Sequence, residues 1–415
     1  MSEIIRKHKI TACPECGQVQ YLPDIIVGES ARCGRCATVL ARKTRDTVEP
    51  VLALALAGLI LFIIANAWPF LSLELKGLVR ETTFASGIVG LYAQGMTGLA
   101  LVVFMTCLVF PLAQLLGLIY LLLPIWLTGA PAPYTAPVYR WLGHLRPWSM
   151  TEVFMLAILV AMIKLSKLAT IVPGPSIWAF AALILVITVA FSLLNPEDIW
   201  QHLPIQGGEP DAAEAQYVTV CHCCRLTCRL PSREEHGFCP RCAARVHGIK
   251  PNSLQRTWAL VIAAMVFYIP ANLYPVTVSG MLGQQQADTI LSGVILFLLS
   301  GSWHIALIIF VASVVIPLVK LIILVYLLLS VQLRSRWRPQ DRTRLYQFTE
   351  AVGRWSMVDV YVVTVLVALV KLSPLASVDA GPGAIYFAGV VVITMFAAQR
   401  FDPRLIWDYE DVNDG

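Results

Sequence analysis

The sequence is poor in charged residues: Asp, Glu, Lys and Arg make up 14% of its 415 residues, whereas 57% are hydrophobic. This balance excludes a soluble globular domain, in which about a quarter of the residues are charged. The first 50 residues contain no long apolar run, so we expect no cleavable signal peptide and a first span that itself directs insertion. The pattern G-x-x-x-x-G-K-[ST] is also absent, which excludes nucleotide hydrolysis through that type of phosphate loop.

What the sequence does contain is a series of long apolar runs. A run of about 18 or more such residues is typical of a membrane-spanning helix. We predict four spans in each half of the chain, at 51–73, 99–127, 152–172, 176–194, 257–275, 302–331, 358–373 and 384–400. The seventh is short and contains a lysine. The predicted fold class is therefore an all-α multi-pass membrane protein with two tandem four-helix units.

Eight of the eleven cysteines form two sets of paired C-x-x-C motifs. The sets are Cys13, Cys16, Cys33 and Cys36, and Cys221, Cys224, Cys239 and Cys242. Within each set 16 or 14 residues separate the two pairs, which is the spacing of a tetrathiolate zinc site. Each turn directs two thiolates at one point, so two turns complete a tetrahedron and leave no open coordination position. We therefore expect two structural Zn²⁺ sites, with iron on the same sulfurs as the alternative.

The cysteine modules are small. The segment between the pairs of the first set, Gln18 to Ala31, is interpreted as a short β-hairpin, so each module is predicted to be a β zinc ribbon that needs its metal to fold. The second module also contains His222, Cys223, Cys228 and His236. One of these neighbours in place of a paired cysteine is the alternative ligand set. The predicted domains are an N-terminal zinc ribbon at 1–48, a four-helix transmembrane unit at 49–203, a second ribbon with its linker at 204–253, and a second four-helix unit with the C-terminal tail at 254–415.

The two halves are copies of one unit, offset by 206 to 208 residues. Besides the cysteines, the motifs that recur include Asn66 and Pro69, which return as Asn272 and Pro275, Trp148-Ser149-Met150, which returns as Trp355-Ser356-Met357, and Lys164-Leu165-Ser166, which returns as Lys371-Leu372-Ser373. Self-similarity over this length indicates a duplicated unit. Four spans return the chain to the same side, so we predict parallel units with a substrate cavity where they meet.

The positive charges are distributed unevenly along the chain. Lys and Arg are concentrated before the first span, between the fourth and fifth, and between the sixth and seventh, whereas 276–301 and 374–383 contain none. The positive-inside rule then places both termini and both ribbons in the cytoplasm. The arginine cluster from Arg334 to Arg344 adjoins a span. We interpret it as an anchor at anionic lipid headgroups and expect no nucleic acid partner.

Several polar side chains fall within the predicted spans, where a charge at the bilayer centre costs at least about 2.5 kcal/mol. The candidates are Lys164, Lys320, Asp359, Lys371, Glu152, Asn66 and Asn272. Lys164 and Lys371 either extend to the membrane surface or meet a lipid phosphate or a carboxylate in a cavity. Lys320, whose counterpart is Gln114, follows Pro317 at an expected bend. We expect Lys320 either to bond the backbone carbonyls that the bend at Pro317 leaves without a partner or to pair with Asp359.

The remaining polar candidates have simpler structural roles. Glu152 and Asp359 open the third span of each unit, where a carboxylate caps the helix N-terminus. Asn66 and Asn272 are expected to bond carbonyls that nearby prolines leave free. The segments 83–92 and 289–298 are too short to cross a membrane and are predicted to be interfacial or re-entrant helices.

We do not expect an enzyme. The sequence shows no Ser-His-Asp arrangement, no open metal site and no pair of carboxylates in a polar context.

Together, the two C-x-x-C sets, the two four-span units and the Trp-Ser-Met and Lys-Leu-Ser signatures resemble the paraquat-inducible protein A family of bacterial inner-membrane proteins. The resemblance covers nearly the whole chain and implies Zn²⁺ at the eight paired cysteines. It also implies a role in intermembrane lipid transport. The protein would load phospholipid into, or receive it from, a periplasmic tunnel formed by a mammalian-cell-entry (MCE) domain partner, and so support envelope integrity. A proton-coupled secondary transporter and a redox-responsive membrane regulator are the alternatives.

Overall fold

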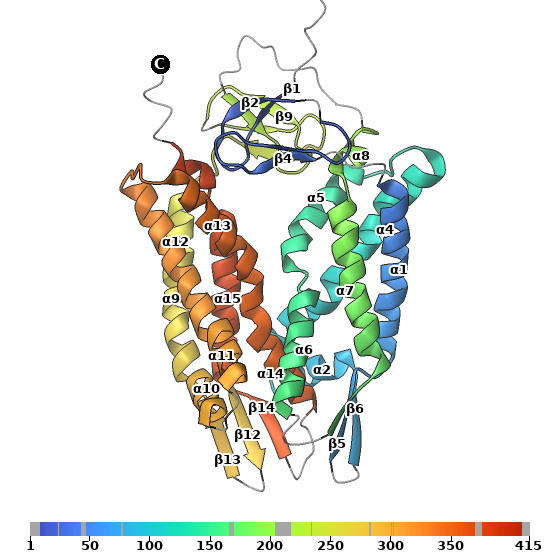
Figure 1. Ribbon diagram of the computed structural model, residues 1–415, viewed down its shortest axis with the longest axis vertical. Coiled ribbons are helices and arrows are strands. Elements are labelled where there is room, and N and C mark those ends of the chain that lie inside the picture. Colours follow the sequence, from blue (N-terminus) through green and yellow to red (C-terminus); the bar gives the residue numbers. More distant parts are fainter. Residues whose placement is uncertain are drawn as a thin grey trace, which may run out of the picture.

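The structure is a computed structural model. It describes residues 9–23, 25–42, 47–75, 78–165, 170–203, 217–233, 235–281, 284–299, 301, 303–369 and 376–408. Figure 1 shows two helical bundles that converge at one end and separate at the other, where the strands of both cysteine modules form a cap. Two further groups of strands project from the converging end. We call these two ends the ribbon side and the sheet side.

The first membrane unit begins with α1 (Val48–Ala67), which runs from the ribbon side to the sheet side (Figure 1). There the chain forms the hairpin of β5 (Leu71–Leu75) and β6 (Leu78–Thr82), and then the short helix α2 (Phe84–Ala93). It returns through α3 (Thr97–Phe104), the π-helical turn η1 (Met105–Val109) and α4 (Phe110–Thr128). The third passage is broken into α5 (Thr135–Leu145), η2 (Arg146–Trp148) and α6 (Thr151–Leu165). The unit ends with β7 (Thr170–Pro173), α7 (Pro175–Leu193) and α8 (Pro196–Trp200).

The second membrane unit repeats this order. It starts with α9 (Ser253–Leu273), β12 (Thr277–Met281), β13 (Gln284–Asp288) and α10 (Ile290–Leu299). The second passage consists of α11 (Trp303–Phe310), the π-helical turn η3 (Val311–Val315) and α12 (Ile316–Gln332). The broken third passage consists of α13 (Pro339–Val352), η4 (Gly353–Met357) and α14 (Val358–Leu369). The unit ends with β14 (Ala376–Ala380), α15 (Pro382–Arg400) and η5 (Pro403–Ile406).

Each cysteine module consists of two antiparallel hairpins. They are β1 (Lys9–Ala12) with β2 (Val19–Leu22), β3 (Ser30–Arg32) with β4 (Val39–Arg42), β8 (Tyr217–Val220) with β9 (Thr227–Leu230), and β10 (His236–Phe238) with β11 (Arg245–His247). The single hairpin predicted at Gln18 to Ala31 is therefore wrong. Each hairpin instead encloses one C-x-x-C pair, because the turn that gathers two thiolates also reverses the chain.

The membrane-spanning helices confirm the predicted fold class. Among the described residues, eight helices are long and apolar enough to cross a membrane. The third and seventh extend over 135–163 and 339–368, so both begin earlier than predicted. The polar residues of α5 and α13 lower the local hydropathy, so the apolar pattern does not indicate where these two spans begin. The first span ends at Ala67 rather than at 73, since the chain changes there to the extended strand β5.

Both second passages contain a π-helical turn next to a proline. The turn η1 ends two residues before Pro111, and η3 ends two residues before Pro317. Widened turns of this kind interrupt the regular hydrogen-bond ladder and are frequent at functional sites. We expected the second span to bend at Pro317, and the structure shows a π-helical turn beside this proline and beside Pro111.

Two three-stranded antiparallel sheets lie on the sheet side. Their strand orders are β6-β5-β7 and β13-β12-β14. The third strand of each sheet follows the third passage, so each sheet ties the end of the first helix to the end of the third. The short helices predicted after the first spans are present as α2 and α10. The strands themselves were not predicted.

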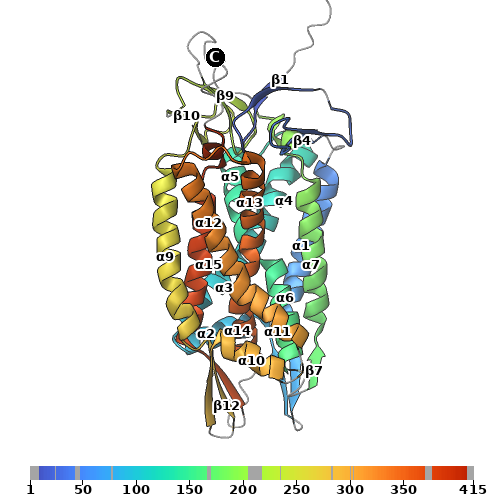
Figure 2. The ribbon, with the colours of Figure 1, turned by 60° about the vertical axis from the view of Figure 1, so that its left-hand side comes forward.

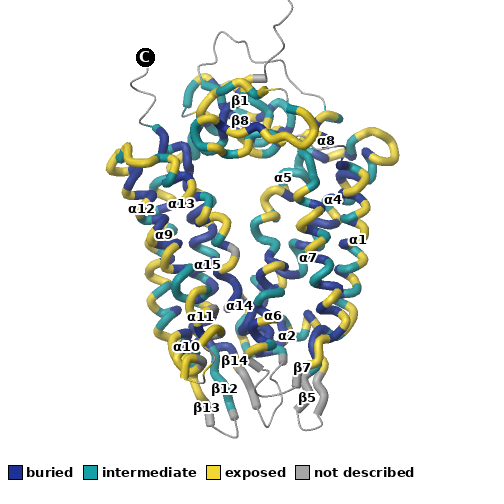
Figure 3. Tube along the Cα trace, viewed as in Figure 1, coloured by how far each residue is buried: buried dark blue, intermediate teal, exposed yellow. Residues whose placement is uncertain are grey.

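The two units pack together mainly near the sheet side. There α14 of the second unit contacts α2 and α6 of the first unit, and Figures 1 and 2 both show these helices gathered at that end. Tyr361 of α14 is fully buried and donates a hydrogen bond of 2.8 Å to the Thr106 hydroxyl in η1. A Cβ atom at Gly87 would lie only 3.2 Å from the Thr364 methyl group, so glycine allows α2 to approach α14. Toward the ribbon side the bundles separate (Figure 3).

Candidate metal centres and the pocket between the units

The four cysteines of each set meet at one point, and their sulfur atoms lie within 4.8 Å of one another. In the first cluster Cys13 Sγ is 3.5 Å from Cys36 Sγ, and Cys16 Sγ is 3.6 Å from Cys33 Sγ. The corresponding pairs of the second cluster are both 3.4 Å apart. Zn–S bonds of about 2.3 Å place tetrahedral sulfurs roughly 3.8 Å apart. Each cluster therefore has the donor set and the size to hold a metal ion. Among the described residues, the second four-cysteine cluster does not include the neighbouring His222, Cys223 and Cys228.

All four C-x-x-C pairs adopt the same backbone turn. The carbonyl of each first cysteine accepts a 2.9 Å hydrogen bond from the N–H four residues later. The residue that donates this bond has a positive φ in every turn: 74° at Gly17, 61° at Ala37, 56° at Arg225 and 52° at Ala243. Only the first is glycine, so three of the turns hold an L-residue in the left-handed region at a cost of about 1–2 kcal/mol each. The contacts that close each cluster must offset this strain.

One titratable side chain, Glu15, lies within the first C-x-x-C turn. Burial, with a contribution from the nearby Glu350 carboxylate, raises the pKa of Glu15 to about 7. The surroundings of this turn thus disfavour charge beyond that of the thiolates.

The first ribbon packs on the second membrane unit. Cys33 belongs to an apolar cluster that includes Tyr346 and Trp407. Gln340 in α13 donates a 2.8 Å hydrogen bond to the Arg35 carbonyl, and the Arg35 guanidinium lies 4.6 Å from the centroid of the Trp407 ring. The ribbon that precedes the first unit is therefore seated on the unit from the other half of the chain.

The second ribbon contacts the first membrane unit in return. Cys221 belongs to an apolar cluster that includes Trp200 and Tyr139. Arg140 in α5 donates a 3.0 Å hydrogen bond to the Ala243 carbonyl. The two ribbons also contact each other through β1 and β8. The thiolate clusters thus cross-connect the two halves of the chain on the ribbon side.

A buried ion pair attaches the second ribbon to the end of the second unit. Asp402 Oδ1 lies 3.1 Å from Arg404 Nε, and the two side chains are 1% and 4% exposed. Asp402 also accepts the Lys250 N–H at 2.9 Å, and Arg404 donates to the Thr219 hydroxyl at 3.3 Å and to the His247 carbonyl at 3.4 Å. Burial by itself would raise the pKa of Asp402, but Arg404 and the Lys250 N–H outweigh it and lower the pKa.

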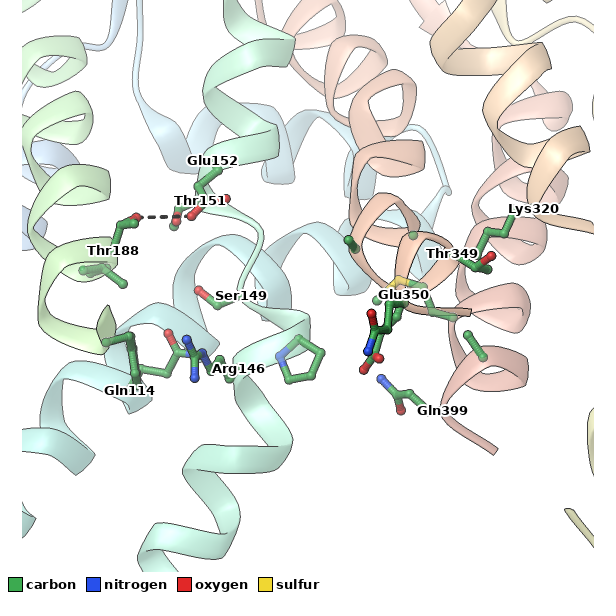
Figure 4. Close-up of a pocket in the computed structure, with 18 residues that line it drawn as sticks. Gln114, Arg146, Ser149, Thr151, Glu152, Thr188, Lys320, Thr349, Glu350 and Gln399 are labelled. Carbon is green, nitrogen blue, oxygen red and sulfur yellow. Dashed lines mark hydrogen bonds between the residues drawn. The ribbon is translucent and has the colours of Figure 1, made fainter. Parts of the chain in front are cut away.

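A pocket of about 500 Å³ lies between the two units, where the third passage of each is broken. The first unit lines it from α4, η2, α6 and α7, and the second unit from α12, α13, η4 and α15. Figure 4 shows Gln114, Arg146 and Glu152 on one wall and Lys320 and Glu350 on the other. The pocket is therefore polar although membrane-spanning helices surround it. It lies where we expected a cavity between the repeats.

Two side chains at corresponding positions of the repeat, Gln114 and Lys320, are buried in the wall of the pocket, at 1% and 3% exposure. Lys320 Nζ donates a 2.9 Å hydrogen bond to the Thr394 hydroxyl. Gln114 Nε2 is buried and has no hydrogen-bond partner among the residues that the structure describes. Glu152 is exposed in the pocket and accepts a 3.2 Å hydrogen bond from the Thr188 hydroxyl. Lys320 and Glu152, two of the predicted polar candidates, thus line one pocket.

Three other candidates fall outside the described residues. Lys371 is not described, and neither are the side chains of Lys164 and Asp359. Their roles, including the pairing of Asp359 with Lys320, stay predictions.

Asn66 and Asn272 bond different carbonyls from those predicted. Asn66 Nδ2 donates to the Phe62 carbonyl at 2.8 Å, and Asn272 Nδ2 donates to the Tyr268 carbonyl at 2.9 Å. Each acceptor lies four residues before the asparagine rather than four residues before a proline. An amide in a helix reaches the carbonyl one turn back on its own face, which is why the prediction was wrong.

Sequence reasoning missed Arg146 as a pocket residue. Its guanidinium lies 5.2 Å from the centroid of the Phe191 ring. Arg146 also lines a second pocket of about 400 Å³, which lies between the ribbons and the end of the first unit. It therefore stands between the two cavities. The sequence did contain an indication of this position. The recurring motif Trp148-Ser149-Met150 lies beside Arg146, where the third passage is broken.

These features define a multi-pass membrane protein with two tandem four-helix units, each preceded by a tetracysteine ribbon. The chain belongs to the paraquat-inducible protein A family, whose model matches residues 48–204 and 254–410.

Curated relatives match nearly the whole chain. It is 32% identical over 404 residues to "Intermembrane transport protein PqiA" of Escherichia coli, with 95% of each chain covered. It is 33% identical over 398 residues to "Lipophilic envelope-spanning tunnel protein A" of the same organism, covering 95% of this chain and 90% of the relative. It is 31% identical over 411 residues to "Probable intermembrane transport protein" of Haemophilus influenzae, with 97% of each chain covered. No solved structure matches the chain.

Proposed function

We propose that this protein is the inner-membrane component of an intermembrane lipid transport system. It loads phospholipid into, or receives it from, a periplasmic MCE-domain tunnel protein. The observation that carries this proposal is the polar pocket between the two units, in a family whose relatives are named intermembrane transport proteins. A polar pocket among membrane-spanning helices matches an amphipathic molecule, because the headgroup requires hydrogen-bond partners and the acyl chains require apolar surroundings.

The thiolate clusters are proposed to hold one structural Zn²⁺ each, through Cys13, Cys16, Cys33 and Cys36 and through Cys221, Cys224, Cys239 and Cys242. Four sulfurs close the coordination sphere, so no position is left for a substrate. The ribbons have only short hairpins as a core and depend on the ion for folding. Because the first ribbon sits on the second unit and the second ribbon contacts both units, the metal-clamped cap fixes the spacing of the two bundles beside the pocket.

The ribbon side is proposed to face the cytoplasm, and the sheet side the periplasm, in accordance with the distribution of Lys and Arg. Two exposed positions test this orientation: Tyr21 in β2, and Gln286 in β13. We expect a membrane-impermeant maleimide to label the variant Gln286→Cys in spheroplasts, and Tyr21→Cys only after permeabilisation. Thiols of the wild-type chain provide the background. Labelling of Tyr21→Cys in intact spheroplasts would contradict the orientation.

Reconstituted lipid transfer tests the function itself. The full chain is placed in donor liposomes that contain a fluorescent phospholipid, and the MCE-domain partner and acceptor liposomes are added. We expect transfer to the acceptors only when both proteins are present, with bound phospholipid detected by mass spectrometry of the purified chain. Donor liposomes without the chain are the control. Equal transfer without it, or absence of bound phospholipid, would refute the proposal.

A further inference from the structure

Two histidines of the second ribbon face each other outside both thiolate clusters. His236 in β10 and His247 in β11 are direct cross-strand partners in the antiparallel register. Their ring centroids are 5.9 Å apart, and the ring planes are inclined by 39°. Because directly opposite residues project their side chains from the same face of a sheet, the two imidazoles share one face of this hairpin. We call His236 and His247 the histidine pair.

We infer that the histidine pair binds one divalent transition-metal ion, such as Zn²⁺, at a site separate from the two thiolate clusters. This inference goes beyond the proposed lipid transport function and does not depend on it.

The separation of the two rings is close to the one that a shared ion requires. A Zn–N bond is about 2.0–2.1 Å long and an imidazole centroid lies about 1.1 Å behind its nitrogen, so each centroid lies about 3.2 Å from the ion. At a tetrahedral angle, the two centroids are then about 5.2 Å apart. A small rotation about the side-chain torsions closes the difference from the observed 5.9 Å.

The ring nitrogens of the histidine pair are available to an ion. His236 is exposed and His247 is half-buried, and among the described residues no hydrogen bond to either ring is present. Neutral imidazole is the commonest protein ligand of transition metals. Glu235 and Arg245 beside the pair are both exposed and carry opposite charges, so they offset each other and leave the binding energy to the imidazoles.

The hairpin holds the two rings in fixed positions. Val246 is 1% exposed and packs in the apolar cluster around the second set of cysteines. The His247 carbonyl accepts a 3.4 Å hydrogen bond from the buried Arg404. A Cβ atom at the following Gly248 would lie only 2.1 Å from the Arg233 carbonyl oxygen, so the chain is closely packed there as well. A backbone fixed in this way reduces the entropy that is lost when an ion joins two ligands.

The histidine pair differs from the thiolate clusters because it is open. Within the described part of the chain, no third His, Cys, Asp or Glu forms a metal-binding group with the pair. Two protein ligands leave two positions of a tetrahedron to water, which makes the ion exchangeable. When the ribbons are aligned on their cysteines, the first ribbon has Ser30 and Ala41 at the corresponding positions. The ribbon fold therefore does not require the pair.

An ion on the histidine pair would link β10 to β11. Cys239 and Cys242 lie in the turn of the same hairpin, so the ion stabilises the part of the ribbon that carries half of the second cluster. We expect added Zn²⁺ to slow amide hydrogen exchange in β10 and β11 of the wild type, and to leave it unchanged in His236→Asn.

Titration with Zn²⁺ alone tests the site directly. The full chain in detergent is passed over a chelating resin that removes exchangeable ions, and the ions that it retains are counted by mass spectrometry. We expect the wild type to bind one further Zn²⁺. His236→Asn and His247→Asn should each weaken this binding about tenfold or more, because the second imidazole acts at a high effective concentration. The double variant should bind no more tightly than either single variant.

Two histidines that bind ions separately would give a different result. The wild type would then take up two further ions, and each single variant would keep one with unchanged affinity. That outcome overturns the inference, and so does a wild type whose affinity is no higher than that of His236→Asn. His144→Asn, at an exposed histidine in α5, is the matched control and retains the wild-type affinity.

The ions retained after the resin show whether a variant is still folded. Each variant should keep the wild-type number of them and the wild-type Tm, so that weaker binding reflects the missing ligand. If His247→Asn loses retained ions, His236→Asn at the more exposed position decides the result.

Discussion

Replacing Cys33 by serine is expected to unfold the first ribbon and to destabilise the second membrane unit with it. Cys33 is 3% exposed, and its Sγ lies 3.6 Å from that of Cys16. Structural zinc supplies about 10–16 kcal/mol in small ribbons, far more than short hairpins can replace. The free thiol Cys223, which lies outside both clusters among the described residues, provides the matched control Cys223→Ser.

Metal content and amide exchange measure this prediction. We expect the metal content of Cys33→Ser to fall from two ions per chain to one, and hydrogen exchange to rise in α13, about 300 residues away along the chain. The reason is that α13 contacts this ribbon through Gln340 and the Arg35 carbonyl. Cys223→Ser should retain both ions and wild-type exchange. Unchanged exchange in α13 after loss of one ion would show that the ribbon does not support the second unit.

The thiolate clusters and most spans could be predicted because their signals are local. The spacing of each C-x-x-C set alone places four sulfurs around a point, and a long apolar run alone predicts a span. The seating of each ribbon on the opposite unit has no such signal. It depends on contacts such as Arg140 with the Ala243 carbonyl, which join residues about 100 positions apart.

The boundaries of the third passages show where hydropathy fails. The helix α5 contains Arg140 and His144, and α13 begins with the sequence Pro-Gln-Asp-Arg. These residues lie toward the ribbons or near the pocket, where polar side chains can form hydrogen bonds. The helices α5 and α13 can therefore contain them. A window of hydropathy cannot distinguish a polar residue in such surroundings from one in a loop.

The pocket could be predicted only in part. Lys320 and Glu152 attract attention because charges are rare within apolar runs. Thr394, which accepts the hydrogen bond from Lys320, gives no signal, since threonine is ordinary in a membrane-spanning helix and bonds its own backbone. The pairing of Lys320 with Asp359 was predicted from charge alone and stays a prediction, because the Asp359 side chain lies outside the described residues. Side-chain partners across helices depend on packing angles that a linear pattern does not contain.

Replacing Asp402 by alanine is expected to cost about 3–5 kcal/mol, because it leaves the Arg404 guanidinium buried without its carboxylate. The two side chains are 1% and 4% exposed. Asp402 also accepts the Lys250 N–H just before α9, so its loss loosens both the start of the second unit and the attachment of the second ribbon. Asp402→Asn should cost less, because the amide oxygen can still accept from Arg404.

Thermal unfolding at several pH values measures this effect. The pKa of Asp402 is lowered in the folded protein, so its contribution is fully present above the unfolded value of about 3.9 and is lost as the pH falls below it. The difference between wild type and Asp402→Ala should therefore be constant from pH 5 to 8 and shrink toward pH 3. The control is Asp341→Ala, because Asp341 is 50% exposed and pairs with Arg338 at 3.6 Å on the surface. Such pairs contribute about 1 kcal/mol or less. Equal losses in the two variants would show that the buried pair does not hold the second ribbon to its unit.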